Sequence, residues 1–294
     1  MTLTDLLEEQ GLDPAQVIAM RHSPKEKELR KVLPWLVHER PAVFNAYQQS
    51  HGGHQEQALE KLVGSGFLAS FVGLRAGTAV FAGLYQIRAA RPVGYREFWD
   101  MHANQALKSF GLPDWDKKYR RKTCLWFDLE LLPAYAQWTG KLEVEWPAPA
   151  IKWWRHAHTK EMPVLSISED SRFSEQMPDW QDLVLTWAEL QAIPSKWKDA
   201  LRQWRGIYFI HDDSDGKGYV GAAYGKDNLL GRWLNYASSG HGGDKLLVAR
   251  HPGNFHFGIL QRVSPDMPAD EVIRVESSWK DRLHTRGEFG LNQN

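Results

Sequence analysis

The sequence predicts a mixed α+β protein of two domains. A helical leader precedes a small β-barrel-like domain, and an α/β domain with a small antiparallel sheet flanked by helices follows. Apolar residues at helical spacing dominate up to about residue 63, and short strand-like runs follow from about residue 64. A hairpin pattern between Gly206 and Gly221 then precedes two helical runs. At 294 residues the chain is long enough for two hydrophobic cores.

The composition indicates the cellular compartment and excludes some kinds of cysteine site. The chain has one cysteine, Cys124, which excludes an intramolecular disulfide framework and a multi-cysteine zinc site, and which is typical of a reducing compartment. The first residues are acidic and amphipathic, and no apolar run reaches membrane-spanning length. We therefore expect a soluble, cytoplasmic protein without a membrane partner.

The charge balance is neutral, with 36 lysines and arginines against 36 aspartates and glutamates. A protein that coats DNA regardless of sequence is expected to be basic overall, so nucleic-acid contact here requires a local basic surface. The 14 tryptophans are the unusual part of the composition, because their rings fill cores and also stack on nucleobases.

The first 63 residues predict helices. Leu3, Leu6 and Leu7 form a small apolar face, and helical spacing of apolar residues continues in the charged segment 24–37. We therefore expect a helical leader in front of the β-rich part.

The apolar pattern changes period near Gly66. Runs at 67–73 and 78–87 flank a short turn and predict a β-hairpin. Further strands are predicted at 123–132, 140–146 and 164–167. Several short strands with one longer insertion predict a small barrel or a strongly curved sheet.

Two segments of this hairpin, Ser70-Phe71-Val72-Gly73 and Ala79-Val80-Phe81-Ala82-Gly83, resemble the PUA superfamily, which includes the EVE, YTH and SRA readers of modified bases. The resemblance implies a PUA-like domain that takes a flipped modified base into an aromatic-lined pocket. The aromatic residues that we expect in this pocket are Tyr85, Trp126, Trp153 and Trp154.

Two tracts, 115–122 and 152–160, interleave cations with aromatic rings. Cations release counterions from phosphates and ring faces stack on bases, so this pattern is typical of DNA contact. The alternative is that Lys and Arg stems cover apolar surface while the indoles fill a core. The cations that we predict to contact DNA are Lys117, Lys118, Arg120, Arg121, Lys122, Lys152 and Arg155.

The polar segment 168–179 predicts a linker, and we place the domain boundary between residues 178 and 179. Apolar residues at helical spacing predict helices at 180–190 and 194–204, the second starting at Pro194.

The last third of the chain carries the strongest functional pattern. Two short apolar runs around a loop of Asp, Ser and Gly predict a hairpin, with Tyr208 in a Gly-Ile-Tyr triplet and Tyr219 in a Tyr-Val-Gly triplet. Both hydroxyls can point to one place if the register puts the tyrosines on the same face. A predicted helix at 228–238 carries Arg232 and Tyr236 four residues apart, on one face. A strand at 255–260 and a helix at 269–283 with Glu276 follow.

The ordered set Tyr208, Tyr219, Arg232, Glu276 and Asn292 resembles the GIY-YIG nuclease family, over about residues 204–294. Valine stands in the second triplet where the commonest form has isoleucine. The resemblance implies a nuclease domain at 179–294 behind a DNA-reading domain at 1–178. It also implies that Glu276 binds one Mg²⁺ or Mn²⁺, because a hard cation needs few protein ligands beside water and phosphate oxygens.

The resemblance assigns roles to the other residues. Arg232 would hold the scissile phosphate through its planar fork. Tyr208 would position or deprotonate the attacking water, helped by Tyr219. Because tyrosine titrates near pH 10, a base at neutral pH needs a nearby cation, and we expect it from Lys217. The remaining predicted site residues are Tyr236, with His241 as the other candidate for its position after the arginine, and Asn292, which matches better than Asn294 and would stabilise the C-terminal part of the site.

These observations predict a metal-dependent DNA endonuclease, a restriction enzyme that depends on 5-methylcytosine or 5-hydroxymethylcytosine. The partner is double-stranded DNA, and a homodimer is expected because one site per chain cuts one strand. One alternative is a structure-specific repair-type nuclease, and another is a non-catalytic nucleic-acid-binding module with a nuclease-like fold. Taken alone, Glu276 also fits a solvated helix residue and Arg232 its salt-bridge partner or a surface charge.

Overall fold

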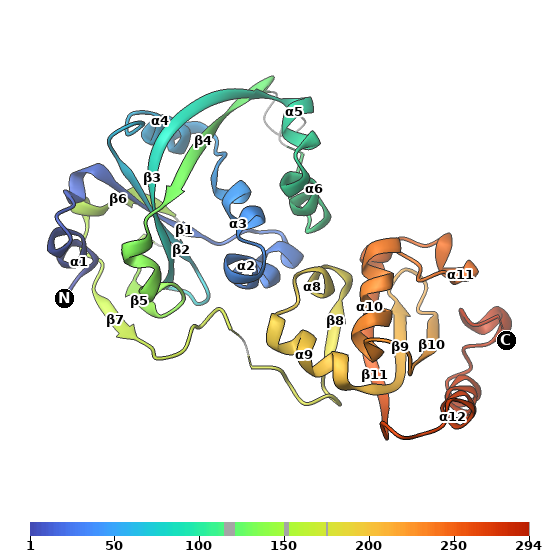
Figure 1. Ribbon diagram of the computed structural model, residues 1–294. Coiled ribbons are helices and arrows are strands. Elements are labelled where there is room, and N and C mark those ends of the chain that lie inside the picture. Colours follow the sequence, from blue (N-terminus) through green and yellow to red (C-terminus); the bar gives the residue numbers. More distant parts are fainter. Residues whose placement is uncertain (115–120, 150–152, 175, 294) are drawn as a thin grey trace. The chain divides into compact units, whose positions relative to one another are not determined.

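The computed structural model describes residues 1–114, 121–149, 153–174 and 176–293. The chain forms two compact units, Met1–Ser174 and Glu175–Asn294 (Figure 1). The boundary expected between residues 178 and 179 lies a few residues after this division. Among the described residues, no helix is both long enough and apolar enough to cross a lipid bilayer.

Unit 1 is built on a curled, half-barrel sheet. The described strands follow the order β6-β1-β2-β3-β5-β7, and β4 also pairs with β3. The sheet curls because β3 pairs with β5 at its start, with β2 further along and with β4 at its end. The strands are β1 (Val17–His22), β2 (Phe67–Val72), β3 (Thr78–Gly94), β4 (Thr123–Leu131), β5 (Leu142–Glu145), β6 (Trp154–His156) and β7 (Val164–Ile167).

The predicted hairpin at 67–87 is confirmed, and so are the later strands of unit 1 with small shifts of their ends. The prediction of helices throughout the first 63 residues is wrong at Val17–His22. This segment is strand β1, buried at every position, parallel to β2 and antiparallel to β6. A strand covered on both faces has a continuous apolar run instead of alternation, so its periodicity does not distinguish it from a helix.

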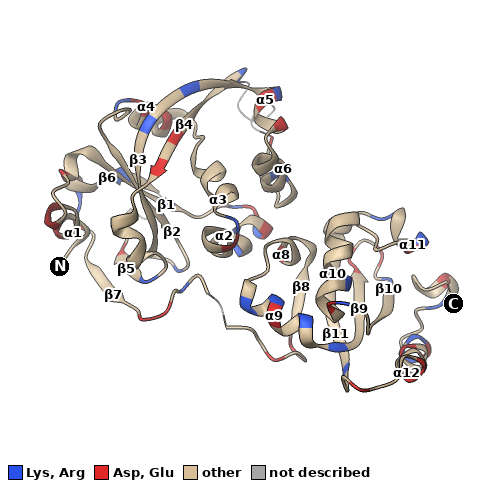
Figure 2. Cartoon of the chain, viewed as in Figure 1, with Lys and Arg blue, Asp and Glu red and all other residues tan. Residues whose placement is uncertain are grey.

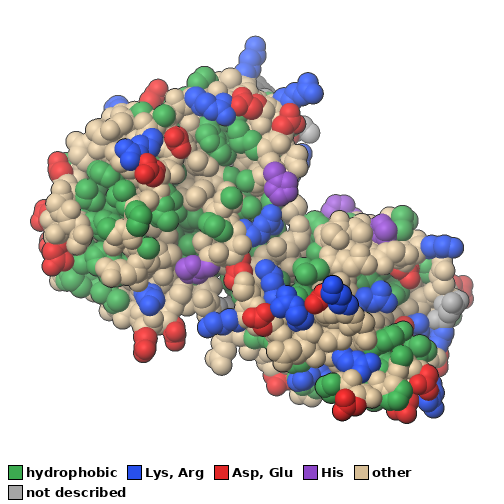
Figure 3. All heavy atoms as spheres, viewed as in Figure 1, with side chains coloured by type: hydrophobic (Ala, Val, Ile, Leu, Met, Phe, Trp, Pro, Cys, Tyr) green, Lys and Arg blue, Asp and Glu red, His purple; other side chains and the backbone are tan. Residues whose placement is uncertain are grey.

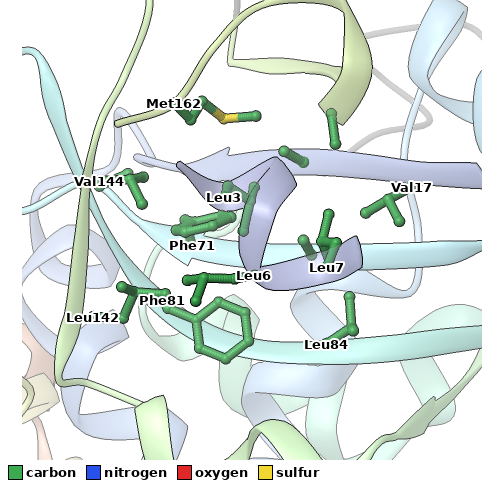
Figure 4. Packing of buried hydrophobic residues seen from close by; sticks show 14 of the residues in the cluster. Leu3, Leu6, Leu7, Val17, Phe71, Phe81, Leu84, Leu142, Val144 and Met162 are labelled. Carbon is green, nitrogen blue, oxygen red and sulfur yellow. The ribbon is translucent and has the colours of Figure 1, made fainter. Parts of the chain in front are cut away.

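Helices and short 3₁₀ turns cover this sheet. Leu3, Leu6 and Leu7 of the first helix pack on Phe71 and Phe81 of the sheet, as Figure 4 shows, which confirms the apolar face expected from their spacing. The helices are α1 (Leu3–Glu9), α2 (Lys27–Glu39), α3 (Pro41–Gln48), α4 (Gly53–Glu60), α5 (Tyr95–Asp100) and α6 (His102–Ser109), and the 3₁₀ turns are Pro14–Gln16, Pro133–Trp138 and Ala157–Thr159.

Charged side chains of unit 1 neutralise one another in pairs. On β3 the side chain of Arg88 pairs with Glu130 of β4, and Arg91 pairs with Glu97 of α5. Figure 2 shows basic segments of β3 beside acidic segments of β4. On the face drawn in Figure 3, basic and acidic side chains are interspersed over each unit, which agrees with a net charge of zero.

Unit 2 contains a small antiparallel sheet flanked by helices. Its described strands follow the order β10-β9-β11-β8. They are β8 (Val184–Thr186), β9 (Arg205–Asp212), β10 (Gly218–Ala223) and β11 (Phe255–Val263). The helices are α8 (Trp187–Ala192), α9 (Ser195–Gln203), α10 (Asn228–Ser239), α11 (Lys245–Val248) and α12 (Ala269–Arg282), and the 3₁₀ turns are Pro252–Asn254 and Gly287–Phe289.

The predicted hairpin β9–β10, the strand β11 and the helices α9, α10 and α12 are confirmed. The helix predicted at 180–190 is wrong in its first half, because Val184–Thr186 form β8 and the helix begins only at Trp187. Thr186 and Glu189 close a reciprocal capping box at this point. A Thr three residues before a Glu is the sequence signal of such a start.

Both faces of the unit 2 sheet are covered. Ile207 and Val220 pack toward Val272 of α12. On the opposite face, Phe257 contacts Trp233 and Tyr236 of α10 at ring-centroid distances of 5.8 and 6.0 Å. Since neighbouring residues of a strand point to opposite faces, Tyr208 lies on the α10 face.

Gly206 occupies a position that a larger residue does not fit. A Cβ atom there would overlap the carbonyl oxygen of Gln261 in the bulged part of β11, and a backbone atom of a paired strand cannot move aside. We expect Gly206→Ala to lower the free energy of unfolding by about 1–3 kcal/mol, measured by chemical denaturation.

The matched control is Gly258→Ala, in β11 of the same sheet, where the nearest atom to an added Cβ is 3.9 Å away. We expect this variant to unfold close to the wild type. Equal losses for both glycines would show that the contact with Gln261 does not set the requirement.

Candidate active site

Three tyrosines from three elements of unit 2 lie together. In the β9–β10 register Tyr208 pairs with Gly221 and Tyr219 with Ile210, which puts both tyrosines on one face of the hairpin. Tyr236 of α10 packs on the same face. The three ring-centroid distances are 6.4 Å for 208–219, 6.1 Å for 208–236 and 6.3 Å for 219–236. The Tyr208 and Tyr236 hydroxyl oxygens lie 3.0 Å apart, in hydrogen-bond contact.

Gly221, the glycine of the second triplet, makes room for this cluster. A Cβ atom at position 221 would overlap the hydroxyl of Tyr208. Any larger residue there would displace that hydroxyl, so the triplet pattern has a direct steric reason.

Arg232 lies on α10 one turn before Tyr236. Its Nε donates a hydrogen bond to the carbonyl oxygen of Ala222 at 3.3 Å, which fixes the guanidinium beside β10. Arg232 also lines a pocket of about 450 Å³ together with Tyr224, Lys226 and Asn228. This pocket leaves room for a phosphate group beside the guanidinium.

Glu276 lies on α12 with a side chain that is 16% exposed, and its carboxylate forms an ion pair with Lys280 at 2.8 Å. The described residues contain no group of three or more His, Cys, Asp or Glu side chains that could hold a metal ion. A single carboxylate is nevertheless a sufficient protein ligand for Mg²⁺ or Mn²⁺ when waters and phosphate oxygens complete the shell. Lys280 occupies this carboxylate in the structure, so an ion bound by Glu276 would take the place of the ammonium.

The three tyrosine hydroxyls are protonated at neutral pH. Burial is the main cause that raises the pKa of Tyr208, Tyr219 and Tyr236, and the proximity of the hydroxyls to one another adds to it. The charge of Glu276 raises the pKa of Tyr208 and Tyr219 further, whereas Arg232 acts in the opposite direction on Tyr208 and Tyr236. The hydroxyls are therefore hydrogen-bonding groups and not preformed bases.

The placement of Lys217 does not support its predicted role. Its Nζ donates a hydrogen bond to the carbonyl oxygen of Glu288 at 2.7 Å, and the residue precedes the first residue of β10. The cation that lowers the pKa of Tyr208 is Arg232. The sequence spacing suggested the same strand face as Tyr219, but a carbonyl of the C-terminal segment binds the ammonium.

Of the two candidates that follow the arginine, Tyr236 belongs to the cluster and His241 takes a different role. His241 accepts a hydrogen bond from the backbone N–H of Gly243 at its Nδ1, at 3.0 Å, and so stabilises the loop after α10. Gly242, which lies between His241 and Gly243, allows this loop to approach the ring of Tyr236 because it has no side chain.

Asn292 is 3% exposed and supports β10 from its outer edge. Its Oδ1 accepts from the N–H of Val220 at 2.9 Å, and its Nδ2 donates to the carbonyl oxygen of Val220 at 2.8 Å. This placement agrees with the stabilising role expected for Asn292. The other candidate, Asn294, lies outside the described residues.

Two residues of this region were missed at the level of sequence. Asp244 caps α11 through the N–H of Leu246 at 2.9 Å, and after burial and Tyr236 its charge also raises the pKa of Tyr219. Arg250 binds Asp212 at 2.6 Å and Asp215 at 2.8 Å and so fixes the hairpin loop. The partners of Arg250 and the effect of Asp244 on Tyr219 involve residues more than twenty positions away, so no local pattern identifies these roles.

The predicted DNA-contacting cations of unit 1 have different environments. Arg155 is 4% exposed, donates to the carbonyl oxygen of Pro147 at 2.8 Å and lies 5.4 Å from the Trp146 ring centre, so a role in DNA contact is not supported. Arg121 forms an ion pair with Glu56 at 2.6 Å and keeps 31% of its side chain exposed. Lys122 is exposed. The other predicted cations, Lys117, Lys118, Arg120 and Lys152, lie outside the described residues.

The four aromatic residues predicted for one base pocket do not line one cavity. Tyr85 is 4% exposed and belongs to a hydrophobic core, against which Trp154 packs. Trp126 packs on the Phe98 ring at a centroid distance of 6.0 Å and lines a separate pocket on β3 and β4. Trp153 lines a cavity with His22 and His51. Trp153 packs against the same core as Trp154, so three of the four aromatic residues contribute to the packing of one hydrophobic cluster, and Trp126 lies apart from them.

His22 should make the stability of the protein depend on pH. Burial, followed by the nearby His51, lowers the pKa of His22 from 6.5 to about 3, although a hydrogen bond to Gln48 opposes this. Between these pH values the unfolded chain binds a proton that the folded chain does not, so the free energy of unfolding falls as pH falls from 6.5 toward 3. We expect a slope of up to about 1.4 kcal/mol per pH unit from this residue.

Denaturant unfolding between pH 7.5 and pH 5 measures this slope, and His22→Gln should reduce it. The control is His102→Gln, at an exposed position on α6, which should leave the slope unchanged. A His22→Gln variant with the wild-type slope would contradict the prediction.

Comparison of the chain with protein-family models, with curated proteins and with solved structures gives no match.

Proposed function

We propose that the protein is a divalent-metal-dependent DNA endonuclease, in which unit 2 hydrolyses the phosphodiester bond and unit 1 reads a modified cytosine. The observation that carries the proposal is the convergence of Tyr208, Tyr219 and Tyr236 beside Arg232, within electrostatic range of Glu276. These residues occur in the order and on the elements that the resemblance to GIY-YIG nucleases implies. No single member of the set would support the proposal alone.

Arg232 and Glu276 would act on the phosphate. The guanidinium lines a pocket with room for the scissile phosphate and can bind two of its oxygens at once. Glu276 would hold Mg²⁺ or Mn²⁺, with Lys280 giving way as its partner. When bound, the ion supplies positive charge that stabilises the crowded phosphate and the departing oxygen.

Tyr208 would position the attacking water. Its hydroxyl is protonated and 3.0 Å from that of Tyr236, so Tyr208 can donate its hydrogen to Tyr236 and keep its oxygen lone pairs to accept a hydrogen from the water. Tyr219 closes the third side of the cluster. The sequence suggested that Tyr208 acts as a base. Because burial disfavours the deprotonated, charged form of tyrosine, we propose instead that the neutral hydroxyl positions the water.

Unit 1 would supply specificity. Its curled sheet and the PUA-like segments of β2 and β3 support a reader of 5-methylcytosine or 5-hydroxymethylcytosine, which makes the protein a modification-dependent restriction enzyme. Because the proposal gives each chain one catalytic site, in unit 2, cleavage of both DNA strands would require two copies of the protein on DNA.

Incubation of the protein with Mn²⁺ or Mg²⁺ and four duplexes tests this function. The duplexes carry cytosine, 5-methylcytosine, 5-hydroxymethylcytosine or an unmodified branch. We expect cleavage of a modified linear duplex and complete loss of cleavage in EDTA. Preferred cleavage of the branched substrate would favour a repair-type nuclease, and binding without cleavage under all conditions would favour a non-catalytic module.

A further inference from the structure

A small cavity lies in unit 1, and its construction indicates a binding site. We call it the histidine pocket: it has a volume of about 160 Å³ and is lined by His22, Tyr47, Ser50, His51, Leu112 and Trp153, with Ala46 completing the wall. The volume is well below the roughly 300–1,000 Å³ of pockets for drug-sized ligands. It suits a single ring of nucleobase size.

The walls of the histidine pocket are largely ring systems. His51 and Trp153 have centroids 5.7 Å apart, and His22 lies edge-on to Tyr47 at 5.3 Å. Aromatic walls from several elements favour a flat ligand, because every ring system offers a face for stacking.

The polar groups of the pocket are uncharged. Burial is the main cause that lowers the pKa of His22 to about 3 and that of His51 to about 4. The Nε2 atom of His22 is held by the hydroxyl of Ser70 at 3.0 Å. The Nε2 atom of His51 is buried and has no hydrogen-bond partner among the described residues. Buried polar atoms of this kind normally have a partner, so His51 lacks one that a ligand can supply.

A second cavity of about 190 Å³ adjoins the histidine pocket and shares Ser50, His51 and Leu112 with it. Arg121 lines this neighbouring cavity, and Lys122, the next residue in the sequence, is exposed to solvent. Cations beside an uncharged aromatic pocket match a base whose sugar and phosphate stay outside.

We propose that the histidine pocket binds one uncharged pyrimidine base flipped out of DNA, stacked on Trp153 and hydrogen-bonded to Nε2 of His51. The inference rests on the proposed function of unit 1 as a reader. Of the four aromatic residues expected from sequence, only Trp153 lines this pocket, and Tyr85, Trp126 and Trp154 do not.

Base flipping can be measured without cleavage, in the full-length Glu276→Gln protein. The probes are duplexes with a central cytosine, 5-methylcytosine or 5-hydroxymethylcytosine, each with 2-aminopurine as the neighbouring base, whose fluorescence rises when stacking is lost. We expect a fluorescence rise and tighter binding for one modified duplex. Trp153→Ala should weaken that binding by about fivefold or more, because that is the least that stacking on one aromatic side chain is worth, and both Trp153→Ala and His51→Leu should abolish the rise.

Matched variants separate pocket loss from misfolding. Trp153→Phe keeps a ring and should restore most of the fluorescence rise, and Trp126→Ala, which alters a different pocket, should leave it unchanged. A rise that survives in Trp153→Ala and His51→Leu, or that is lost in Trp126→Ala alone, would overturn the inference. Flipping without nuclease activity in the wild-type protein would leave this inference standing and refute only the nuclease assignment.

Discussion

Replacement of Glu276 by glutamine is expected to reduce DNA cleavage about 10³-fold with little change in DNA affinity or fold. Glutamine keeps the size of the side chain and removes the charge that a divalent ion requires. The carboxylate is mostly buried beside Lys280, so its removal also leaves an ammonium beside the position that we propose for the metal. Single-turnover cleavage at saturating Mn²⁺ measures the loss, and fluorescence anisotropy measures DNA affinity.

Glu271 provides the matched control for this change. It lies on the same helix, α12, and is exposed to solvent, so Glu271→Gln removes an equal charge away from the tyrosines. We expect wild-type cleavage from this variant. If Glu276→Gln cleaves as fast as Glu271→Gln, the carboxylate is a structural helix residue and the metal site is elsewhere.

Removal of one oxygen atom in Tyr208→Phe is expected to reduce cleavage about 10²–10³-fold. The ring remains to fill its fully buried position, while the hydrogen bond to Tyr236 and the oxygen that we propose to position the attacking water are lost. The reduction should appear in the rate of the chemical step, with DNA affinity unchanged. Rapid-quench measurement of the first turnover distinguishes the two.

Tyr135→Phe is the control for loss of a buried hydroxyl. Tyr135 is 3% exposed in unit 1, and its hydroxyl has no hydrogen-bond partner among the described residues. This variant should cleave at the wild-type rate. Equal rates for Tyr208→Phe and wild type would exclude the Tyr208 hydroxyl from the reaction.

Local patterns predicted most of the fold. The hairpins at 67–87 and 205–223 follow from short apolar runs around turn residues, and α10 and α12 follow from helical spacing. The strand β1 could not be predicted in the same way, because its two faces are buried in two different hydrophobic clusters that include residues distant in sequence. Tertiary burial, not local propensity, decides such a segment.

The candidate site was predicted in part because its residues lie on regular elements. The register of a tight hairpin determines that Tyr208 and Tyr219 share a face, and the helical period brings Tyr236 to the side of Arg232. The hydrogen-bond partner of a long cationic side chain cannot be predicted in this way. Lys217 and Arg155 bind carbonyl oxygens of other segments, and these partners become visible only in the folded chain.

The hydrogen bonds of Asn292 affect how copies of this protein can associate. β10 lies at the end of its sheet, and an open strand edge is a template on which a strand of another molecule can add. The side-chain amide of Asn292 occupies both backbone groups of Val220, and the N–H of Leu291 occupies the carbonyl oxygen of Gly218. The C-terminal segment thus shields the edge against intermolecular β-addition, and two copies assembled on DNA would have to meet through a surface other than a sheet continued across β10.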